Sequence, residues 1–383
     1  MRVAIVGAGL GGVTAAILFA RAGHKVQVFE QSPVLLRIGA GIGLGPNVLR
    51  VMQHVGVYER MMERGIVLTR ALSRVWDTGD IIFEQRSAEW TEAFGLPTLT
   101  MHRGDMLKYL VDQLPQDALH LGKRVIDLEP AGDHTRIRFA DGGTVDADVV
   151  IGADGVNSRI REILFGVRPP KYTNVVAYRS IFPTALLGGA TLSADMTKWW
   201  SDDRHPAAED RHFIAYYLTA DRSEVYFVTG SPEPNWPGGV SSIPADIAEI
   251  RRCYEGFHPE VQGLIDACPA ASKWPLLEQD PIPLWNAENV VLLGDACHPM
   301  KPHMGQGAGM AIEDAAVLVR CFERAADDRH RAFALYYANR FERTARVQRM
   351  SHVNSWMRED TDPSWVYGYD ATRVSLTAGD SPR

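Results

Sequence analysis

Short apolar runs that end in glycine turns are the main pattern of this chain. Residues 3–6 run into a glycine turn at residues 7–12, an alanine-rich segment follows as far as Gly23, and a second apolar run spans residues 25–29. A strand that leads through glycines into a helix and back to a strand is typical of parallel α/β sheets. The start of the chain therefore predicts a strand–helix–strand unit.

The same pattern occurs twice more, far along the chain. Residues 149–151 enter a glycine turn at Gly152, and residues 290–293 enter a turn at Gly294 and Asp295, with a helix predicted over residues 310–320. Strand ends of an open parallel sheet meet along one crevice. We therefore expect all three glycine turns to face one long ligand.

Between Tyr172 and Pro283, in the middle of the chain, the pattern changes. Residues 213–218 and 224–229 predict the two antiparallel strands of a hairpin. Successive side chains of a strand point to opposite faces, so only one of Tyr216 and Tyr217 can face a pocket. Such a sheet would form a roof over the crevice.

Together these patterns predict an α/β protein, with a Rossmann-like domain and an interleaved antiparallel-sheet domain. We expect the first domain to span residues 1–171, with an inserted segment of the second lobe at about 68–100. The substrate-binding sheet would span residues 172–283, and residues 284–383 would complete the first domain and add C-terminal helices. The polar residues after about Thr372 predict a frayed end.

Composition narrows the class of protein. The 383 residues carry a net charge of −7 and no apolar run long enough to span a bilayer, which argues against nucleic-acid and membrane partners. The four cysteines show no CxxC spacing, so we expect reduced thiols, a cytoplasmic protein and no metal site; they are Cys253, Cys268, Cys297 and Cys321.

The first glycine turn has the pattern of a dinucleotide site. Gly7 would permit the tight turn, Gly9 would let the backbone approach a pyrophosphate, and Gly12 would allow close packing of helix on strand. Glu30 ends the second strand, where a carboxylate accepts hydrogen bonds from ribose hydroxyls. The turn alone does not distinguish NAD from FAD.

Three motifs together carry a resemblance to a known family. The segments GAGLGG, GADGVNSRIR and GDACHPMKPHMGQGAG begin at Gly7, Gly152 and Gly294. In this order and separation they resemble the single-component FAD-dependent aromatic hydroxylases. The resemblance implies a para-hydroxybenzoate hydroxylase-like fold, one bound FAD and transient NADH, with NADPH less favoured. It also implies that O2 forms a flavin C4a-hydroperoxide that hydroxylates an aromatic substrate, in a monomer or homodimer.

The resemblance also implies cofactor contacts along the whole chain. Residues that would follow the adenosine and pyrophosphate are Gly11, Gly12, Glu30, Gln31, Arg103, Val125 and Asp154. Residues that would meet the ribityl chain and the flavin ring are Asp295, Gly307 and Ala308, with Gly43 in a glycine-rich loop from Gly39 that would let the ring move. A helix that begins near Gly307 would place its positive end against the reduced flavin.

Within this family the chain resembles the decarboxylating hydroxylases of hydroxypyridine carboxylates such as 6-hydroxynicotinate. The resemblance implies substrate contacts from His205 or His212, from Tyr216 and from His303. We favour His212 because it directly precedes the strand that carries Tyr216; a histidine base near the substrate hydroxyl would speed attack. Gly43 stands where these hydroxylases have a histidine. Further polar candidates for the pocket wall are Tyr178, Arg179 and Tyr217.

Three alternatives stay open. A salicylate-hydroxylase-like enzyme would act on a benzoate, and an FAD-dependent reductase would transfer hydride without oxygen chemistry. A nucleotide-sensing regulator would need a partner-binding element or a DNA-reading helix with a basic face, and neither is evident in the sequence.

Overall fold

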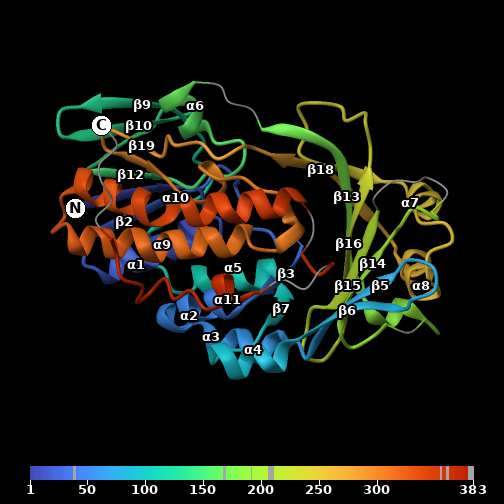
Figure 1. Ribbon diagram of the computed structural model, residues 1–383. Helices are drawn as coiled ribbons and strands as arrows, with labels where there is room; N and C mark the ends of the chain where they lie inside the picture. The colour runs from blue at the N-terminus through green and yellow to red at the C-terminus, as the bar shows by residue number, and fades with distance from the viewer. Residues whose placement is uncertain are drawn as a thin grey trace.

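Two lobes lie side by side in the computed structural model (Figure 1), one a sheet packed with helices and the other a large, mostly antiparallel sheet. The structure describes residues 1–37, 40–166, 170–190, 192–205, 211–353, 356–358 and 362–377. Gly39 of the expected glycine-rich loop lies outside the described residues.

The first lobe is built on a six-stranded sheet in the order β19-β20-β12-β1-β2-β8. β1 pairs in parallel with β2 and with β12, and β12 pairs in parallel with β20. The three glycine turns therefore follow neighbouring parallel strands, which confirms that they meet at one edge of the sheet. The strands are β1 (Arg2–Val6), β2 (Lys25–Phe29), β8 (Leu119–His120), β12 (Val149–Gly152), β19 (Asn286–Ala287) and β20 (Val290–Leu292).

Three helices form one cover of this sheet. α1 (Leu10–Arg21) packs against α9 (Gly307–Arg324), and α9 packs against α10 (Arg329–Val353), as Figure 1 shows. α9 begins at Gly307, where the family resemblance implied a helix start and three residues before the start that the sequence pattern predicted. Its first turn therefore lies directly after the third glycine turn. The helix positions its N-terminus by burying its apolar face against α1.

The second lobe is an eight-stranded sheet in the order β17-β18-β13-β16-β15-β14-β5-β6. β15 and β16 pair antiparallel, with His212 opposite Gly230 and Tyr217 opposite Val225, which confirms the predicted hairpin. The strands are β5 (Arg70–Val75), β6 (Ile81–Arg86), β13 (Lys171–Pro183), β14 (Met196–Trp200), β15 (His212–Tyr217), β16 (Glu224–Pro232), β17 (Ile243–Ala245) and β18 (Ala271–Glu278).

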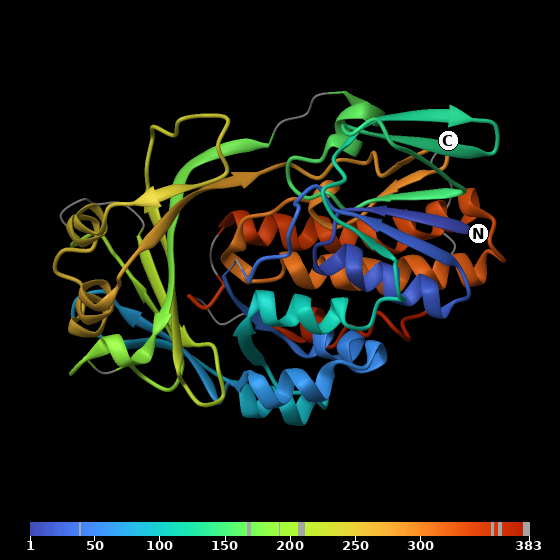
Figure 2. The ribbon, with the colours of Figure 1, turned by 180° about the vertical axis from the view of Figure 1, so that it is seen from behind.

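The two faces of this sheet have different neighbours. Helices α7 (Ile247–Cys253) and α8 (Pro259–Ala267) cover the face turned away from the first lobe (Figure 2). Phe213 and Phe227 pack into the apolar cluster beneath these helices, whereas Tyr216 and Tyr226 form a second cluster on the opposite face. That opposite face is turned toward the first lobe.

Smaller elements complete the first lobe. One three-stranded sheet comprises β3 (Gly41–Leu44), β7 (Leu99–His102) and β4 (Ile66–Val67), and another comprises β9 (Val125–Ala131), β10 (His134–Phe139) and β11 (Thr144–Ala147). The remaining α-helices are α2 (Pro46–Val55), α3 (Tyr58–Arg64), α4 (Ser87–Phe94), α5 (Arg103–Val111), α6 (Arg159–Phe165) and α11 (Ser364–Tyr367). Short 3-10 turns span Gly294–Ala296 and Pro302–Met304 in this lobe, whereas a third, Thr184–Leu187, follows β13 and contacts α8 in the second lobe.

The C-terminal segment differs from expectation. The frayed end predicted after about Thr372 is wrong as far as Thr377. The Thr377 N–H donates to the Asn339 side chain at 2.9 Å, and the Arg320 guanidinium donates to the Val374 carbonyl at 2.6 Å. The segment is therefore fixed to α9 and α10 by side chains that local polarity does not reveal.

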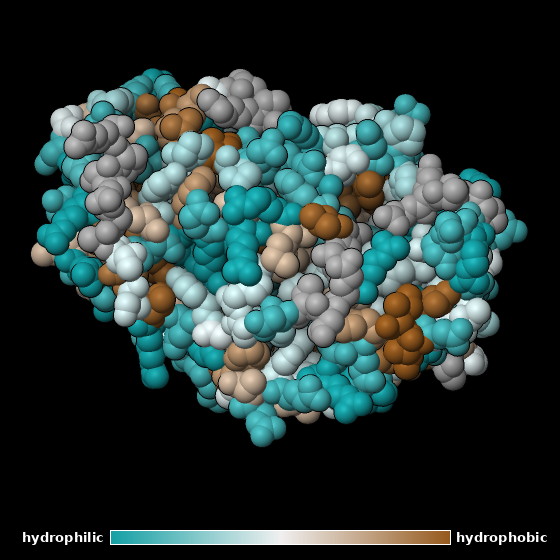
Figure 3. Space-filling view, viewed as in Figure 1, coloured by the Kyte–Doolittle hydropathy of each residue, from teal (hydrophilic) through white to brown (hydrophobic). Residues whose placement is uncertain are grey.

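The face seen in Figure 3 carries mainly polar residues. Figure 3 shows a face that is largely hydrophilic, with hydrophobic residues in small separate groups. Among the described residues, no helix has the length and apolar character needed to cross a bilayer.

Candidate active site

A cleft of about 1740 Å3 lies between the two lobes. The first lobe lines it with all three glycine turns, with the loop that carries Gly41 and Gly43, and with the first turn of α9. The second lobe lines it with the inner face of the eight-stranded sheet. The strand ends that were expected to converge therefore open onto this cleft.

The glycines of the first turn differ in what surrounds them. Gly7 has a φ of +108°, and a Cβ there would lie 2.3 Å from the Ala153 carbonyl oxygen, while a Cβ at Gly12 would lie 2.1 Å from the Gly7 carbonyl oxygen. At Gly9, by contrast, the nearest atom would be the Arg103 guanidinium at 4.0 Å. Packing thus requires Gly7 and Gly12, whereas Gly9 leaves the backbone open to the cleft beneath Arg103.

Two charged side chains, Asp295 and Arg103, line the cleft near the glycine turns. Burial raises the pKa of Asp295, and the Arg103 charge partly opposes that rise; burial lowers the pKa of Arg103, with the Asp295 charge opposing it. Within the described part of the chain, neither charged group has a side-chain hydrogen bond. A carboxylate suits the hydroxyls of a ribityl chain and a guanidinium suits a phosphate, so these residues fit FAD.

Glu30, at the end of β2, has partners within the protein. Its carboxylate accepts the Ala8 N–H at 2.9 Å and the Ser32 N–H at 2.8 Å, which holds the first glycine turn against β2. Gln31 is exposed, and Val125 is buried at the start of β9. None of these three predicted adenosine contacts is among the residues that line the cleft itself.

Asp154, in the second glycine turn, caps α6. Its carboxylate accepts the Ser158 hydroxyl at 2.5 Å and the Ile160 N–H at 3.0 Å. Burial raises its pKa, and these hydrogen bonds oppose that rise. The cleft is lined here by the neighbouring residues 155–157 rather than by Asp154, so its carboxylate shapes the turn.

The first turn of α9 faces the cleft through Gly307 and Ala308. A helix N-terminus offers unpaired N–H groups and a positive dipole end, which favour an anionic ligand. The Asn47 amide donates to the Gln306 side chain at 3.1 Å and to the Glu313 carboxylate at 2.7 Å. This amide ties the start of α2 to α9.

The glycine loop crosses the inner face of the large sheet. A Cβ at Gly41 would lie 2.5 Å from the Tyr226 ring and 2.8 Å from the Tyr216 hydroxyl, so only glycine lets the loop lie this close. A Cβ at Gly43 would meet only the Met196 methyl within 4 Å among the described atoms, at 3.7 Å. The loop therefore has room for a side chain at Gly43 and none at Gly41.

Two histidines meet at the far end of the cleft. The rings of His212 and His303 lie edge to face with their centroids 5.7 Å apart, and both line the cleft. Burial, together with the charge of Lys198, lowers the pKa of His212 well below its usual value and that of His303 to about 4. His303 Nδ1 lies 2.8 Å from the Ser351 carbonyl oxygen. A carbonyl oxygen can only accept, so Nδ1 carries the proton and Nε2 is left as an acceptor.

Tyr216 also lines the cleft, on the same strand face as His212. Its ring meets that of Tyr226 edge to face at 5.2 Å. Burial raises the pKa of Tyr216 well above its usual value and that of Tyr226 to about 12, so both phenols stay protonated and are able to donate.

Other candidates from the sequence lie away from the cleft. His205 packs edge to face on Trp76 at 4.9 Å, and the Tyr178 hydroxyl donates to Glu249 at 2.8 Å. Tyr217 points to the face opposite Tyr216, as strand alternation predicted. Of the two histidines weighed for the substrate contact, His212 is therefore the one at the cleft.

Lys198 is a cleft residue that sequence reasoning did not single out. Its side chain is buried, and its Nζ lies 3.6 Å from the centroid of the Trp200 ring. It is placed beside His212 by the pairing of β14 with β15. The signal available in the sequence was a lysine that directly precedes two tryptophans in the strand Met196–Trp200.

A buried polar network lies behind the cleft and holds α9. Asp314 accepts His298 Nε2 at 2.5 Å and Arg340 Nε at 2.7 Å, and Arg340 and Arg343 both pair with Glu313. Although burial by itself lowers the pKa of His298, its neighbours Cys297 and Asp314 raise it well above the usual value. The network therefore joins the third glycine turn to α9 and α10.

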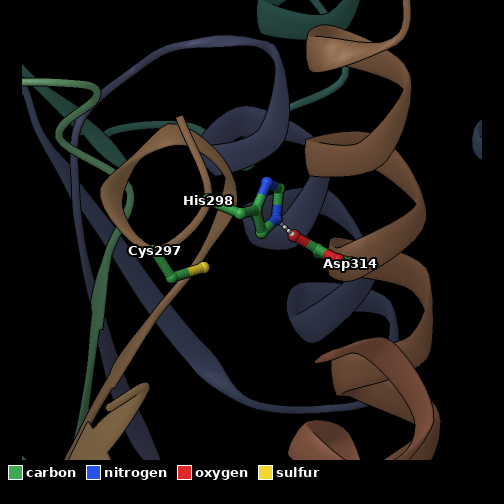
Figure 4. A group of neighbouring side chains, drawn as sticks. All are labelled: Cys297, His298 and Asp314. Carbon is green, nitrogen blue, oxygen red and sulfur yellow. Dashed lines mark hydrogen bonds and ion pairs between the residues drawn. The ribbon is translucent and has the colours of Figure 1, made fainter. Parts of the chain in front are cut away.

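The same network contains a trio with metal-ligand chemistry. Potential ligand atoms of Cys297, His298 and Asp314 lie within 4.8 Å of one another, and Figure 4 shows His298 pointing from the turn to Asp314 on α9. Both carboxylate oxygens of Asp314 already accept hydrogen bonds, from His298 and from Arg340. The trio therefore braces the turn through hydrogen bonds.

Comparisons with known proteins show which family this chain belongs to. Residues 1–180 and 271–352 match the family described as an FAD binding domain. The chain belongs to this family and, within it, to the single-component FAD-dependent aromatic hydroxylases; it is an FAD-dependent aromatic monooxygenase with their para-hydroxybenzoate hydroxylase-like fold.

Individual relatives cover nearly the whole chain. Over 381 residues the chain is 48% identical to 6-hydroxynicotinate 3-monooxygenase of Bordetella bronchiseptica, a match that covers 99% of this chain and 97% of the relative. It is 46% identical over 378 residues to the protein of the same name from Pseudomonas fluorescens, covering 98% and 96%. The solved structure of Klebsiella pneumoniae HpxO with FAD and uric acid is 25% identical, with a TM-score of 0.81 over 96% of this chain and 91% of that one.

Proposed function

We propose that this chain is an NADH-using monooxygenase that hydroxylates a hydroxypyridine carboxylate such as 6-hydroxynicotinate and releases its carboxylate as CO2. The observation that carries the proposal is the pair of histidines, His212 and His303, in the same cleft that the glycine turns face. The identity of 46% and 48% to two proteins named 6-hydroxynicotinate 3-monooxygenase supports the choice of substrate.

The proposed reaction conserves atoms and electrons. The acid, O2, NADH and a proton give a dihydroxypyridine, CO2, NAD+ and water. One oxygen atom enters the ring at the carbon that carries the carboxylate, and the other leaves as water. The two electrons come from NADH, and bound FAD supplies the site at which O2 is activated. Loss of CO2 restores the aromatic ring.

His212 would act as the base. A hydroxylated ring becomes a stronger nucleophile when its O–H is deprotonated, and a positioned histidine contributes about 10²–10⁴-fold to such a step. The lowered pKa of His212 keeps the imidazole neutral, which is the form that accepts a proton. Tyr216 would donate a hydrogen bond to the same substrate oxygen, and His303 would orient the ring through its acceptor Nε2.

The cofactor contacts follow the cleft. We propose that Gly9, Gly11, Gly12 and Arg103 hold the pyrophosphate, that Asp295 holds the ribityl hydroxyls, and that Gly307 and Ala308 meet the flavin ring. Glu30, Gln31 and Val125 would meet the adenosine at its far end. Asp154 would act through the turn that it caps.

The proposal is tested by turnover of the purified, FAD-loaded protein. NADH and NADPH oxidation are followed with 6-hydroxynicotinate, salicylate and 3-hydroxybenzoate, and products are identified by mass spectrometry. We expect 6-hydroxynicotinate to stimulate NADH oxidation most strongly. A substrate with a 13C-labelled carboxylate should release labelled CO2 and dihydroxypyridine in equal amounts.

Other outcomes identify the alternatives. Selective turnover of salicylate would indicate a benzoate hydroxylase instead. NADH oxidation that produces only hydrogen peroxide, with every aromatic acid recovered unchanged, would indicate a reductase without oxygenation.

A further inference from the structure

Two cations lie in one row across the inner face of the eight-stranded sheet. Strand pairing places Lys198 opposite Ile214, Ile214 opposite Val228, and Val228 opposite Arg179. Directly paired residues point to the same face, and each of these four lines the cleft. Three strand spacings of about 4.8 Å separate Lys198 from Arg179, which is about 14 Å.

Arg179 is a cation without an acidic partner. Its guanidinium lies 5.3 Å from the centroid of the Trp274 ring, and its Nε is buried with no hydrogen bond among the described residues. No carboxylate in the described part of the chain forms an ion pair with it. A half-buried cation whose Nε has no acceptor favours an anionic ligand, because that ligand would supply the missing acceptor.

The walls around Arg179 are aromatic and open to solvent. Tyr172 and Trp236 lie with their ring centroids 6.4 Å apart, and both line the cleft with Trp274. The Trp274 N–H donates to the Ser272 hydroxyl at 2.8 Å, which fixes its ring beside Arg179. Residues 237–240, which extend this wall, are exposed, so a ligand here is able to exchange with solvent.

The aromatic acid of the proposed function is too short to occupy the part of the cleft beside Arg179 and Trp274 as well. A single ring with one carboxylate spans only about one to two strand spacings, or roughly 5–10 Å. A ring held between His212 on β15 and His303 would therefore not reach Trp274 on β18, which lies three strands from β15. The part of the cleft beside Arg179 and Trp274 therefore suits a second organic reactant.

We propose that Arg179 and Trp274 form the docking site of the reduced pyridine dinucleotide, separate from the aromatic-acid pocket. The inference rests on the proposed function, which requires such a donor. A dinucleotide carries an anionic pyrophosphate for the guanidinium and flat rings for the Trp274, Trp236 and Tyr172 walls. Entry by the exposed 237–240 edge lets the donor arrive and leave while the aromatic acid stays bound.

The test uses the oxidised, FAD-loaded protein. Binding of 1,4,5,6-tetrahydro-NADH, a non-reducing analogue, is measured by calorimetry for the wild type, Arg179→Gln and Trp274→Leu. We expect each variant to raise the Kd of the analogue at least tenfold. The Kd of 6-hydroxynicotinate, measured by the change in flavin absorbance, should stay within twofold of the wild type, and FAD should remain at one per chain.

Two further variants serve as controls. Arg222→Gln removes an arginine that lies over Tyr217 at 5.7 Å, on the side of the sheet away from the cleft, and should leave the Kd of the analogue unchanged. Arg179→Lys keeps the charge without the planar stack and should give an intermediate Kd, which guards against a folding defect in Arg179→Gln.

The opposing outcomes are distinct. A raised Kd for 6-hydroxynicotinate with normal analogue binding would make Arg179 a substrate anchor, and loss of FAD would make it a cofactor contact; either overturns the assignment. If Arg179→Gln binds the analogue, 6-hydroxynicotinate and FAD like the wild type, the assignment is overturned as well. If the wild type binds no analogue and NADH reduces no flavin, the proposed function falls together with the inference.

Discussion

His298 donates to Asp314 across 2.5 Å, and this bond joins the third glycine turn to the middle of α9. Both side chains are fully buried, and Asp314 also accepts from Arg340. A single carboxylate therefore holds together the turn that carries Asp295 and the helix whose first turn faces the cleft.

Replacement of Asp314 should destabilise the fold strongly. Asp314→Asn leaves the buried Arg340 charge with one partner fewer, and removing one member of a buried ion pair costs about 3–5 kcal/mol. Urea denaturation of the FAD-loaded protein measures this change in the free energy of unfolding. Asp148→Asn, which breaks the exposed pair with Arg2, is the control and should cost less than about 1 kcal/mol. Equal effects of the two variants would contradict the role given to the network.

A methyl group at Gly12 should disrupt the cofactor site. The added Cβ would lie 2.1 Å from the Gly7 carbonyl oxygen, so α1 must move away from β1. We expect Gly12→Ala to purify with little FAD and to bind added FAD at least tenfold more weakly. Gly189→Ala, where no atom of the described chain lies within 4 Å of the new Cβ, should bind FAD like the wild type. The absorbance of bound flavin reports both results.

Loss of the proposed base should slow hydroxylation without loss of cofactor. We expect His212→Ala to lower kcat by about 10²-fold or more, which is the contribution of a positioned base. Tyr216→Phe should lower it by about tenfold through one lost hydrogen bond. Tyr217→Phe changes the neighbouring tyrosine on the opposite strand face and should keep full activity. Full activity in His212→Ala would remove His212 from the proposed site.

The pH dependence of stability should carry a contribution from His303. Burial lowers its pKa in the folded protein to about 4, against 6.5 for an ordinary histidine. The folded state therefore binds this proton less readily than the unfolded state does. The resulting stability is fully present above pH 6.5 and is lost as the pH falls toward 4.

His303→Asn removes this titration. The variant should lose less stability than the wild type between pH 6.5 and pH 4.5, as measured by urea denaturation at several pH values. His54→Asn, at an exposed position, is the control and should follow the wild type. Parallel curves for His303→Asn and the wild type would contradict the buried neutral state of His303.

Local chemistry explains which parts of the structure the sequence could predict. The parallel core follows from apolar runs that end in glycine, because Gly7 and Gly12 are required by contacts within a few residues or with the adjacent strand. The opposite facing of Tyr216 and Tyr217 follows from the strand period alone. Both features depend on short-range rules.

The parts that were missed depend on long-range pairing. Lys198 and Arg179 share a row only because β14, β15, β16 and β13 pair in one register, and no local pattern gives that register. The capping role of Asp154 and the anchoring of Thr377 likewise arise from partners that folding brings together. Sequence patterns predict the strands and turns, but they do not predict which side chains meet across them.

The buried polar network that holds α9 also bears on enzyme engineering. Glu313 and Asp314 on this helix are fixed by Arg340, Arg343 and His298, so substitutions in the helix offer no freedom to reshape the cleft. Adaptability must come from the loop around Gly43, where a new side chain finds open space. Libraries that aim to accept bulkier rings should therefore vary this loop and leave the helix untouched.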